Sequence, residues 1–353
     1  MRSKIEYKVW LKHRNEKNLI RRTREKYYRK RQLTKKYTYN DLNKKTASKS
    51  GTYDTVFKAP LTFSFVENKE ETIAFFEELI NFISDKRNFG KSLFIDISYI
   101  HQLTTDALMY LLAIVNNLNA NFSKKYNFSG NAPNEESVRS KFNESGFYNF
   151  VKHRNDISLE YKSDKVQIVT GDNSNTEIAK QLSDFVSNKG GIPQKVNRFL
   201  YTTMIELMSN THKHAYNNND AILPRWYCFA EYDGDDIIVF TFMDTGAGIP
   251  STVRKKFIEK IDILGLKGDS SYVTSALNGD FRTETGHYFR GKGLPKIKLF
   301  CKDRKIQNLR IITNKADVSI EGASVHSMEN TKSLRGTLYR WEVSLQHLRG
   351  EKV

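Results

Sequence analysis

The sequence of 353 residues has only two cysteines, Cys228 and Cys301, and only six prolines. The two cysteines lie far apart and have no metal-ligand spacing, which excludes a disulfide framework and favours a reducing, cytoplasmic setting. No apolar run approaches the roughly 20 residues that a membrane helix needs, so we expect no transmembrane segment. The first residues also lack the apolar core of a secretory signal.

Acidic residues are scarce in the first part of the chain. Residues 1–50 hold 18 of the 57 Lys and Arg residues but only 4 of the 40 Asp and Glu residues. Most of the net charge of +17 therefore belongs to this segment, and the rest of the chain is nearly neutral. Interleaved Arg, Lys and Tyr suit contacts with phosphates and stacking on nucleic-acid bases. A solvated helix, a disordered arm, an acidic partner protein and an anionic membrane surface remain alternatives.

Strands and helices alternate in the next segment, residues 51–165, which predicts a small α/β domain. Its helices are apolar at helical spacing, whereas "KSLFIDISYI" is a short, dense apolar strand. We expect helices at 71–86, 104–122 and 135–146, and strands at 91–100 and 126–130.

This order resembles the STAS domain of anti-sigma-factor antagonists. The matching segments are "LFIDIS" as the central strand, "LTTDALMYLL" at the start of a helix, and "GNAPNEESVRSKFNESGF" as the closing strand, turn and helix. The resemblance implies a partner protein, and it puts the family's phosphorylatable serine near Thr104 or Thr105. Leu103 and Asp106 replace the family's Asp and Gly, so we favour a helix-capping role for Thr104 over a phosphoacceptor role.

The helix predicted at 196–216, "VNRFLYTTMIELMSNTHKHAY", has two different faces. Glu206, Asn210, Lys213 and His214 share one stripe at helical spacing. Taken alone, such a polar stripe is usually a solvated surface. The opposite stripe is the predicted core face. It consists of Val196, Leu200, Thr203, Met204, Leu207, Met208 and Thr211.

A second polar segment, "DTGAGIP", follows an apolar strand directly. That strand is predicted to form a hairpin with residues 225–233 through a "GDD" turn. Asp244 at the strand end would aim a carboxylate into a pocket, and Gly246 and Gly248 would let a ligand ring approach the backbone.

Two further segments complete the pattern. "RGKGL" puts Gly291, Lys292 and Gly293 just ahead of a predicted helix, where backbone N–H groups favour phosphate. "RGTLYRWEV" puts Gly336 and Thr337 at the predicted start of a strand.

These four segments, in this order, resemble the GHKL superfamily of ATP-binding domains, which includes gyrase, heat-shock-90 chaperones, histidine kinases and mismatch-repair ATPases. "ELMSNTHKHA" is similar to the N box, "DTGAGIP" to the G1 box, "RGKGL" to the G2 box, and "RGTLYRWEV" to the final Gly-Thr strand. The resemblance covers residues 166–353. It implies an α/β sandwich with a mixed, largely antiparallel sheet layered with helices, and it implies that ATP and Mg²⁺ bind.

The resemblance also implies a role for each matching residue. Glu206 would be the general base and Asn210 the protein ligand of Mg²⁺. Asp244 would accept a hydrogen bond from the adenine amino group, assisted by Thr337. Lys213 and His214 would lie near the phosphates, Gly246 and Gly248 would line the base pocket, and Gly291, Lys292, Gly293 and Leu294 would hold the phosphates.

Three functions fit this pattern. We favour an ATP-hydrolysing conformational switch or signalling regulator, in which ATP closes a lid predicted at 251–290. The sequence does not decide whether the chain forms a homodimer. The alternatives are an anti-sigma-type Ser/Thr protein kinase acting on a STAS-like domain, and a non-catalytic nucleotide-binding adaptor whose basic arm contacts nucleic acid. An autophosphorylating histidine kinase is disfavoured, because none of the eight histidines has the His-Glu pattern of a dimerisation helix.

Overall fold

The computed structural model of the chain describes residues 53–122, 125–151, 161–162, 164–214, 225–281 and 293–350. Residues Ser48–Val353 belong to one compact unit. The basic segment at 1–50 lies outside the described residues, so its contact with nucleic acid stays a prediction. Within the described ranges, no helix is both long enough and apolar enough to cross a bilayer.

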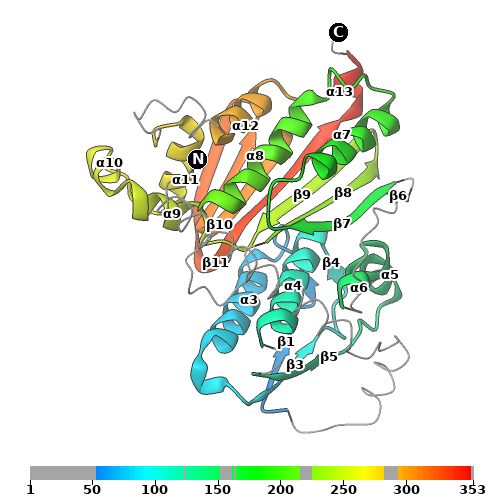
Figure 1. Cartoon of the computed structure of the whole chain (residues 1–353), viewed down its shortest axis with the longest axis vertical. Coiled ribbons are helices and arrows are strands. Elements are labelled where there is room, and N and C mark those ends of the chain that lie inside the picture. Colours follow the sequence, from blue (N-terminus) through cyan, green and yellow to red (C-terminus); the bar gives the residue numbers. More distant parts are fainter. Residues whose placement is uncertain are drawn as a thin grey trace, which may run out of the picture. The chain divides into compact units, whose positions relative to one another are not determined.

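The first part of the described chain contains a small parallel sheet with helices packed against it (Figure 1). Its elements are β1 (Thr55–Lys58), β2 (Thr62–Phe63), α3 (Lys69–Ser84), the 3-10 turn η1 (Lys86–Asn88), β3 (Ser92–Asp96), β4 (Gln102–Leu103), α4 (Thr105–Asn117), the π-helical turn η2 (Leu118–Phe122), β5 (Asn127–Gly130), α5 (Glu136–Glu144) and α6 (Phe147–Val151). The sheet has the order β1-β3-β5, so the strand that contains "LFID" is central, as predicted. The short strands β2 and β4 form a separate parallel pair.

The second part contains a six-stranded sheet layered with helices (Figure 1). Its elements are β6 (Tyr161–Lys162), β7 (Lys165–Gly171), α7 (Thr176–Gly190), α8 (Arg198–His214), β8 (Trp226–Gly234), β9 (Ile237–Asp244), α9 (Ile249–Lys256), α10 (Ile258–Ile263), α11 (Asp269–Asn278), α12 (Gly293–Lys302), β10 (Gln307–Glu321), β11 (Ser324–Ser344) and α13 (Leu345–Gly350). The strand order is β10-β11-β9-β8-β7-β6, and each pairing given by the described residues is antiparallel.

The predicted hairpin of β8 and β9 is confirmed. Its turn residues Asp235 and Asp236 have φ angles of 46° and 59°. Two adjacent residues with positive φ give a type I′ turn, whose twist matches that of the flanking strands. A second hairpin, β10 and β11, turns at Gly322, which has a φ of 58°. The sequence analysis did not anticipate this second hairpin.

The central strands of the large sheet are buried on both faces. Along β8, Trp226 and Cys228 belong to the core that includes the apolar face of α8, whereas Tyr227 and Phe229 belong to the core that includes α4. Successive side chains of a strand point to opposite faces, so a strand covered on both sides reads as a continuous apolar run. This explains why β9 is apolar up to Asp244 with the exception of Thr241.

One predicted strand start is wrong. The strand expected to begin at Gly336 is β11, which begins at Ser324. Gly336 lies inside it, with a φ of 89°, beside an irregularity in the register between β10 and β11. The glycine therefore marks an irregularity inside a long strand. The predicted start was wrong because the β10–β11 hairpin continues the pairing on the N-terminal side of Gly336.

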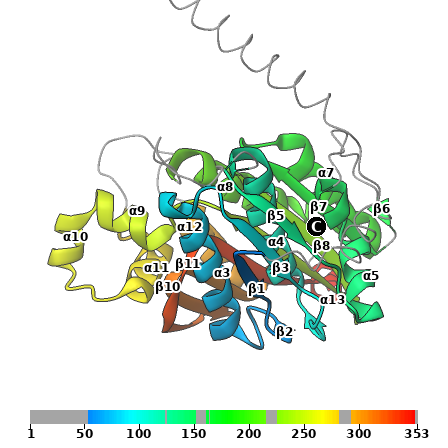
Figure 2. The same cartoon turned by 90° about the horizontal axis from the view of Figure 1, so that it is seen from below.

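The described part of the predicted lid, residues 251–281, folds largely into the short helices α9, α10 and α11 beside the β10–β11 hairpin (Figure 2). Val253, Ile261, Tyr272 and Phe281 form a small core of their own. The first turn of α11 is also fixed to the hairpin, since the Asp269 carboxylate accepts a hydrogen bond from the Lys315 N–H at 3.0 Å. Movement of this segment upon ligand binding stays a prediction.

The predicted boundary at residue 165 also stays a prediction. A core of buried side chains crosses it, since α4 packs against the face of the sheet that carries Tyr227, Phe229, Met243 and Leu338. Each of these four side chains is at most 3% exposed.

We therefore expect a truncated chain, residues 164–353, to aggregate or to lose cooperative unfolding, because it exposes this apolar face. Size-exclusion chromatography and urea unfolding would test this, with residues 48–353 as the control. A monomeric truncated chain that unfolds cooperatively would contradict the expectation.

Candidate functional site

A row of polar side chains crosses three adjacent strands of the large sheet. Thr337 on β11 pairs with Asp244 on β9 and with Thr313 on β10. The hydroxyl oxygens of Thr313 and Thr337 are 3.2 Å apart. Strand alternation places all three side chains on the face that also carries Phe242 and Tyr339, which is the face covered by α8.

The loop after β9 is built closely around this row. The Gly246 N–H donates to Asp244 Oδ1 at 2.8 Å, and the Ile249 N–H donates to Thr313 Oγ1 at 3.1 Å. Gly248 has a φ of 88°, and a Cβ there would lie 2.7 Å from Thr313 Oγ1. The loop therefore needs glycine at this position both for its backbone conformation and for the close approach.

Burial raises the pKa of Asp244 to about 6, although hydrogen bonds from the Gly246 N–H and the Thr337 hydroxyl lower it in part. The carboxyl is therefore mostly ionised at neutral pH. Its side chain is only 8% exposed. A carboxylate offers about four acceptor positions, so Asp244 can accept a further hydrogen bond from a ligand.

Helix α8 has the two faces that its sequence predicts. Its core face is confirmed. Leu200, Thr203, Met204, Leu207, Met208 and Thr211 are each at most 2% exposed, and Val196, which was also predicted on this face, lies in the turn before α8 and is 9% exposed. On the other face Glu206 and Asn210 are half-buried.

The structure brings Glu206 to the first residue of α12. A Cβ added to Gly293 would lie 2.7 Å from Glu206 Oε2, so the carboxylate lies directly against the Gly293 backbone. The N–H groups at the start of a helix attract negative charge, which suits both a carboxylate and a phosphate. Two of the four predicted segments, far apart in the sequence, therefore meet at this point.

The remaining predicted residues are only partly described. Leu294 is half-buried in the first turn of α12 and packs against the core that includes α8. The backbones of Lys213 and His214 form the last residues of α8, but their side chains lie outside the described part of the chain. Gly291 and Lys292 fall in the undescribed range 282–292.

Two further residues at the site, Thr313 and Asn314, were not predicted from the sequence. Asn314 accepts hydrogen bonds from the N–H and the hydroxyl of Ser251, at 3.2 and 2.9 Å, and its Nδ2 donates to the Ala247 carbonyl at 3.0 Å. It thereby fixes the loop after Asp244 to β10. No motif surrounds these two residues, and only the positive φ of 50° at Asn314 sets them apart from an ordinary strand.

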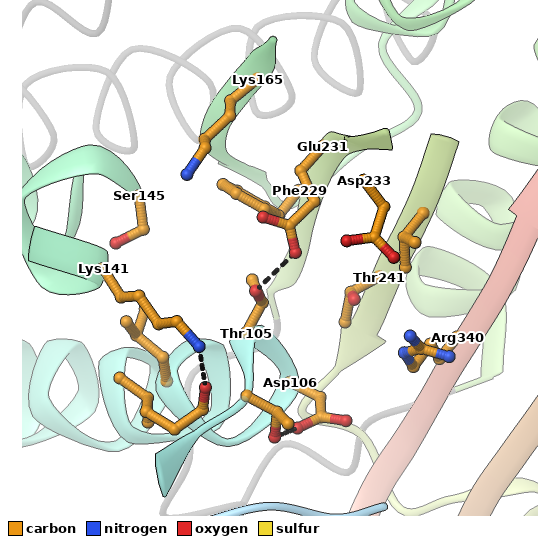
Figure 3. A pocket seen from close by; sticks show the side chains of 14 residues that line it. Thr105, Asp106, Lys141, Ser145, Lys165, Phe229, Glu231, Asp233, Thr241 and Arg340 are labelled. Atoms are coloured by element: carbon orange, nitrogen blue, oxygen red, sulfur yellow. Dashed lines mark hydrogen bonds between the residues drawn. The ribbon is translucent and has the colours of Figure 1, made fainter. Parts of the chain in front are cut away.

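A cavity of about 240 Å³ lies on the opposite face of the large sheet (Figure 3). Thr104, Thr105 and Asp106 at the start of α4 line it from one side, and Glu231 on β8 and Arg340 on β11 line it from the other. Thr105 Oγ1 donates to Glu231 Oε1 at 3.2 Å. The cavity has acidic and basic side chains in its lining, and it does not include Asp244 or Glu206.

The expected capping role of Thr104 is wrong for its side chain. Thr104 occupies the N-cap position of α4, but its hydroxyl caps no backbone N–H of the helix. Instead the hydroxyl donates to the Asp106 carboxylate, which is only 2% exposed. A buried carboxylate needs a donor, and this need outweighs the local preference for capping.

No family model matches the chain, and no curated protein matches it.

Replacing Asp244 by Asn is expected to stabilise the chain at neutral pH. Because the folded-state pKa of Asp244 is raised from 3.8 to about 6, its ionised form destabilises the fold, by roughly 3 kcal/mol when fully ionised. The stability that the protonated group provides is complete below about pH 4 and is lost as the pH rises through 6. Urea unfolding at pH 4.5 and 7.5 should therefore show a larger gain for Asp244→Asn at pH 7.5.

The exposed Asp233 gives the control, because Asp233→Asn removes the same charge from the same sheet. An equal change in the free energy of unfolding of Asp244→Asn at both pH values would contradict the raised pKa of Asp244.

Proposed function

We propose that the chain binds Mg-ATP in the manner of the GHKL superfamily and acts as an ATP-hydrolysing conformational switch or signalling regulator. The adenine would lie at the Asp244–Thr337 row and the triphosphate near the start of α12. The observation that carries the proposal is the contact of Glu206 with the Gly293 backbone. This contact places Glu206, the proposed general base, beside the N-terminus of α12, where backbone N–H groups favour phosphate.

The adenine end of the site has a matching chemistry. The adenine amino group is a donor, and the buried Asp244 carboxylate retains acceptor capacity beside the Thr337 hydroxyl. Gly246 presents backbone without a side chain at the same place, whereas Thr313 and Asn314 occupy the side of Gly248 where a Cβ would stand. Since the carboxylate costs free energy while it is buried, a ligand donor that pairs with it recovers part of that cost.

The phosphate end would be served by Glu206 and Asn210 on one face of α8. Among the described residues, no group of three or more His, Cys, Asp or Glu side chains is arranged to hold a metal ion. The amide oxygen of Asn210 would be a protein ligand for Mg²⁺, which commonly takes its other ligands from phosphates and water and neutralises their charge. Glu206 would accept the proton of an attacking water.

The geometry does not favour phosphate transfer to Thr104 or Thr105 within one chain. Both residues line the cavity on the face of the sheet opposite to Asp244 and α8. The Thr105 hydroxyl is also hydrogen-bonded to Glu231. A protein kinase of the anti-sigma type would therefore have to act on another molecule. Release of phosphate from ATP without any protein acceptor would distinguish a switch from such a kinase and from a non-catalytic adaptor.

Three substitutions separate the proposed roles. We expect Asp244→Ala to abolish binding of both adenosine and Mg-ATP, and Asn210→Ala to weaken Mg-ATP binding without changing adenosine binding. Glu206→Gln should still bind Mg-ATP but lose about a hundredfold or more in phosphate release. Calorimetry and a phosphate assay would measure these effects.

The exposed Glu321, at the far end of β10, supplies the control substitution Glu321→Ala. If the native chain binds neither ligand, the proposal fails. If it binds Mg-ATP and never releases phosphate, an adaptor replaces the switch.

The affinity for adenosine should fall at acidic pH. The bound amino group needs the ionised form of Asp244, whose pKa burial raises to about 6, so protons compete with the ligand below that pH. We expect a constant dissociation constant above about pH 7 and a rise of about tenfold per pH unit well below pH 6. Adenosine is the probe because the terminal phosphate of a nucleotide itself titrates near pH 6. Binding that stays constant between pH 5 and 8 would exclude Asp244 as the acceptor.

A further inference from the structure

Helices α3 and α4 of the first part contact a continuous stretch of β11. The contacts run from Met328 to Arg335, the residue that precedes Gly336 and Thr337. They are Lys69 with Met328, Glu70 with Thr331, Glu77 with Lys332 and the Ser333 N–H, and Tyr110 with Arg335. Lys69 also pairs with Asp317 on the neighbouring strand β10, at 2.6 Å.

The last of these contacts reaches the candidate adenine site. Tyr110 is 2% exposed, and its ring packs against Phe76 and Phe65 with centroid distances of 4.5 and 5.7 Å. Its hydroxyl donates to the Arg335 carbonyl at 2.7 Å. Burial raises the pKa of this phenol, so it stays protonated and remains a donor across the physiological range. A ring held by packing keeps its hydroxyl in one place.

Gly336 is the residue that needs such a fixed partner. It has a φ of 89°, and a Cβ there would lie 2.0 Å from the Asp244 carbonyl oxygen, so only glycine fits. Glycine has the greatest backbone freedom, and its neighbours must restrain it. The Tyr110 hydroxyl binds the carbonyl before Gly336, and the Thr313 hydroxyl donates to the carbonyl of Gly336 itself at 2.8 Å.

The two peptide groups around Gly336 are therefore held from opposite faces of the sheet. Thr313 belongs to the face covered by α8, and Tyr110 comes from the core that includes α4. Thr337 follows directly and pairs with Asp244. A change in the Tyr110 contact would consequently alter the position of Thr337 and of the groups that surround Asp244, without touching the start of α12.

We propose that Tyr110, which no sequence motif singles out, is a positioning residue for the adenine end of the site, and that through it the first part of the chain sets the affinity for the base. This inference rests on the proposed function.

Tyr110→Phe removes the hydroxyl and keeps the packed ring. A lost neutral hydrogen bond of this kind corresponds to about threefold to tenfold in an equilibrium constant. We expect Tyr110→Phe to weaken adenosine binding measurably, by up to about that factor, and to leave binding of Mg-tripolyphosphate unchanged, both measured by calorimetry on the full chain. The difference between the two ligands separates positioning at the base from a general loss of stability.

Tyr126→Phe is the matched control. Tyr126 is 4% exposed, and its hydroxyl also donates to backbone carbonyls, those of Phe82 and Ile83 at 3.2 Å each, but these lie within the first part. We expect this variant to bind both ligands like the native chain. The inference is overturned if Tyr110→Phe binds adenosine as the native chain does, or if it weakens both ligands equally.

Hydrogen exchange without ligand provides a second readout. Tyr110→Phe should accelerate amide exchange in peptides that cover residues 334–338, whereas Tyr126→Phe should not. Unchanged exchange in Tyr110→Phe would contradict the positioning role. If the native chain binds no adenosine, the proposed function fails, and the exchange result still decides whether Tyr110 holds this segment.

Discussion

Near Asp244, strands β8, β9 and β11 carry buried apolar side chains on both faces, and this double burial makes a carboxyl group costly at that end of the large sheet. The sheet has room for a carboxylate at the end of β9, where Asp244 meets a glycine loop on one side and the Thr337 hydroxyl on the other. Burial there raises the pKa of the carboxyl to about 6. A buried carboxyl with a raised pKa is a candidate functional group, and in the proposed function Asp244 accepts a hydrogen bond from the ligand.

The large sheet also separates the candidate nucleotide site from the cavity that contains Thr104 and Thr105. The face covered by α8 carries Asp244, Thr337 and, on the helix, Glu206 and Asn210. The other face carries the mixed-charge cavity with Thr104 and Thr105. The sheet stands between them, so in the proposed account the first part of the chain would act on the site through the backbone of β11, which the Tyr110 hydroxyl contacts at Arg335.

Local patterns in the sequence predicted much of this arrangement. The core face of α8 follows from apolar spacing, the β8–β9 hairpin follows from its Gly-Asp-Asp turn, and Asp244 follows from its place after a buried strand. Non-local packing could not be predicted in this way. The alternation within β8 shows that both faces are apolar, but it does not say that α4 covers one of them. Thr313 joins the row only because β10 and β11 pair, and the hydroxyl of Thr104 serves a buried carboxylate instead of its helix. The resemblance to a family implied a catalytic role for Glu206 and a phosphate-holding role for Gly293, but their proximity could not be read from spacing along the chain.

The most direct measurement is a crystal structure of the chain with Mg²⁺ and a non-hydrolysable ATP analogue. The account predicts the adenine amino group within hydrogen-bond distance of Asp244, with Thr337 beside it, and the phosphates at the start of α12 between Glu206 and Asn210. An analogue bound instead in the cavity formed by Thr105, Glu231 and Arg340 would contradict the central claim. So would a base that lies away from Asp244 while the phosphates occupy the start of α12.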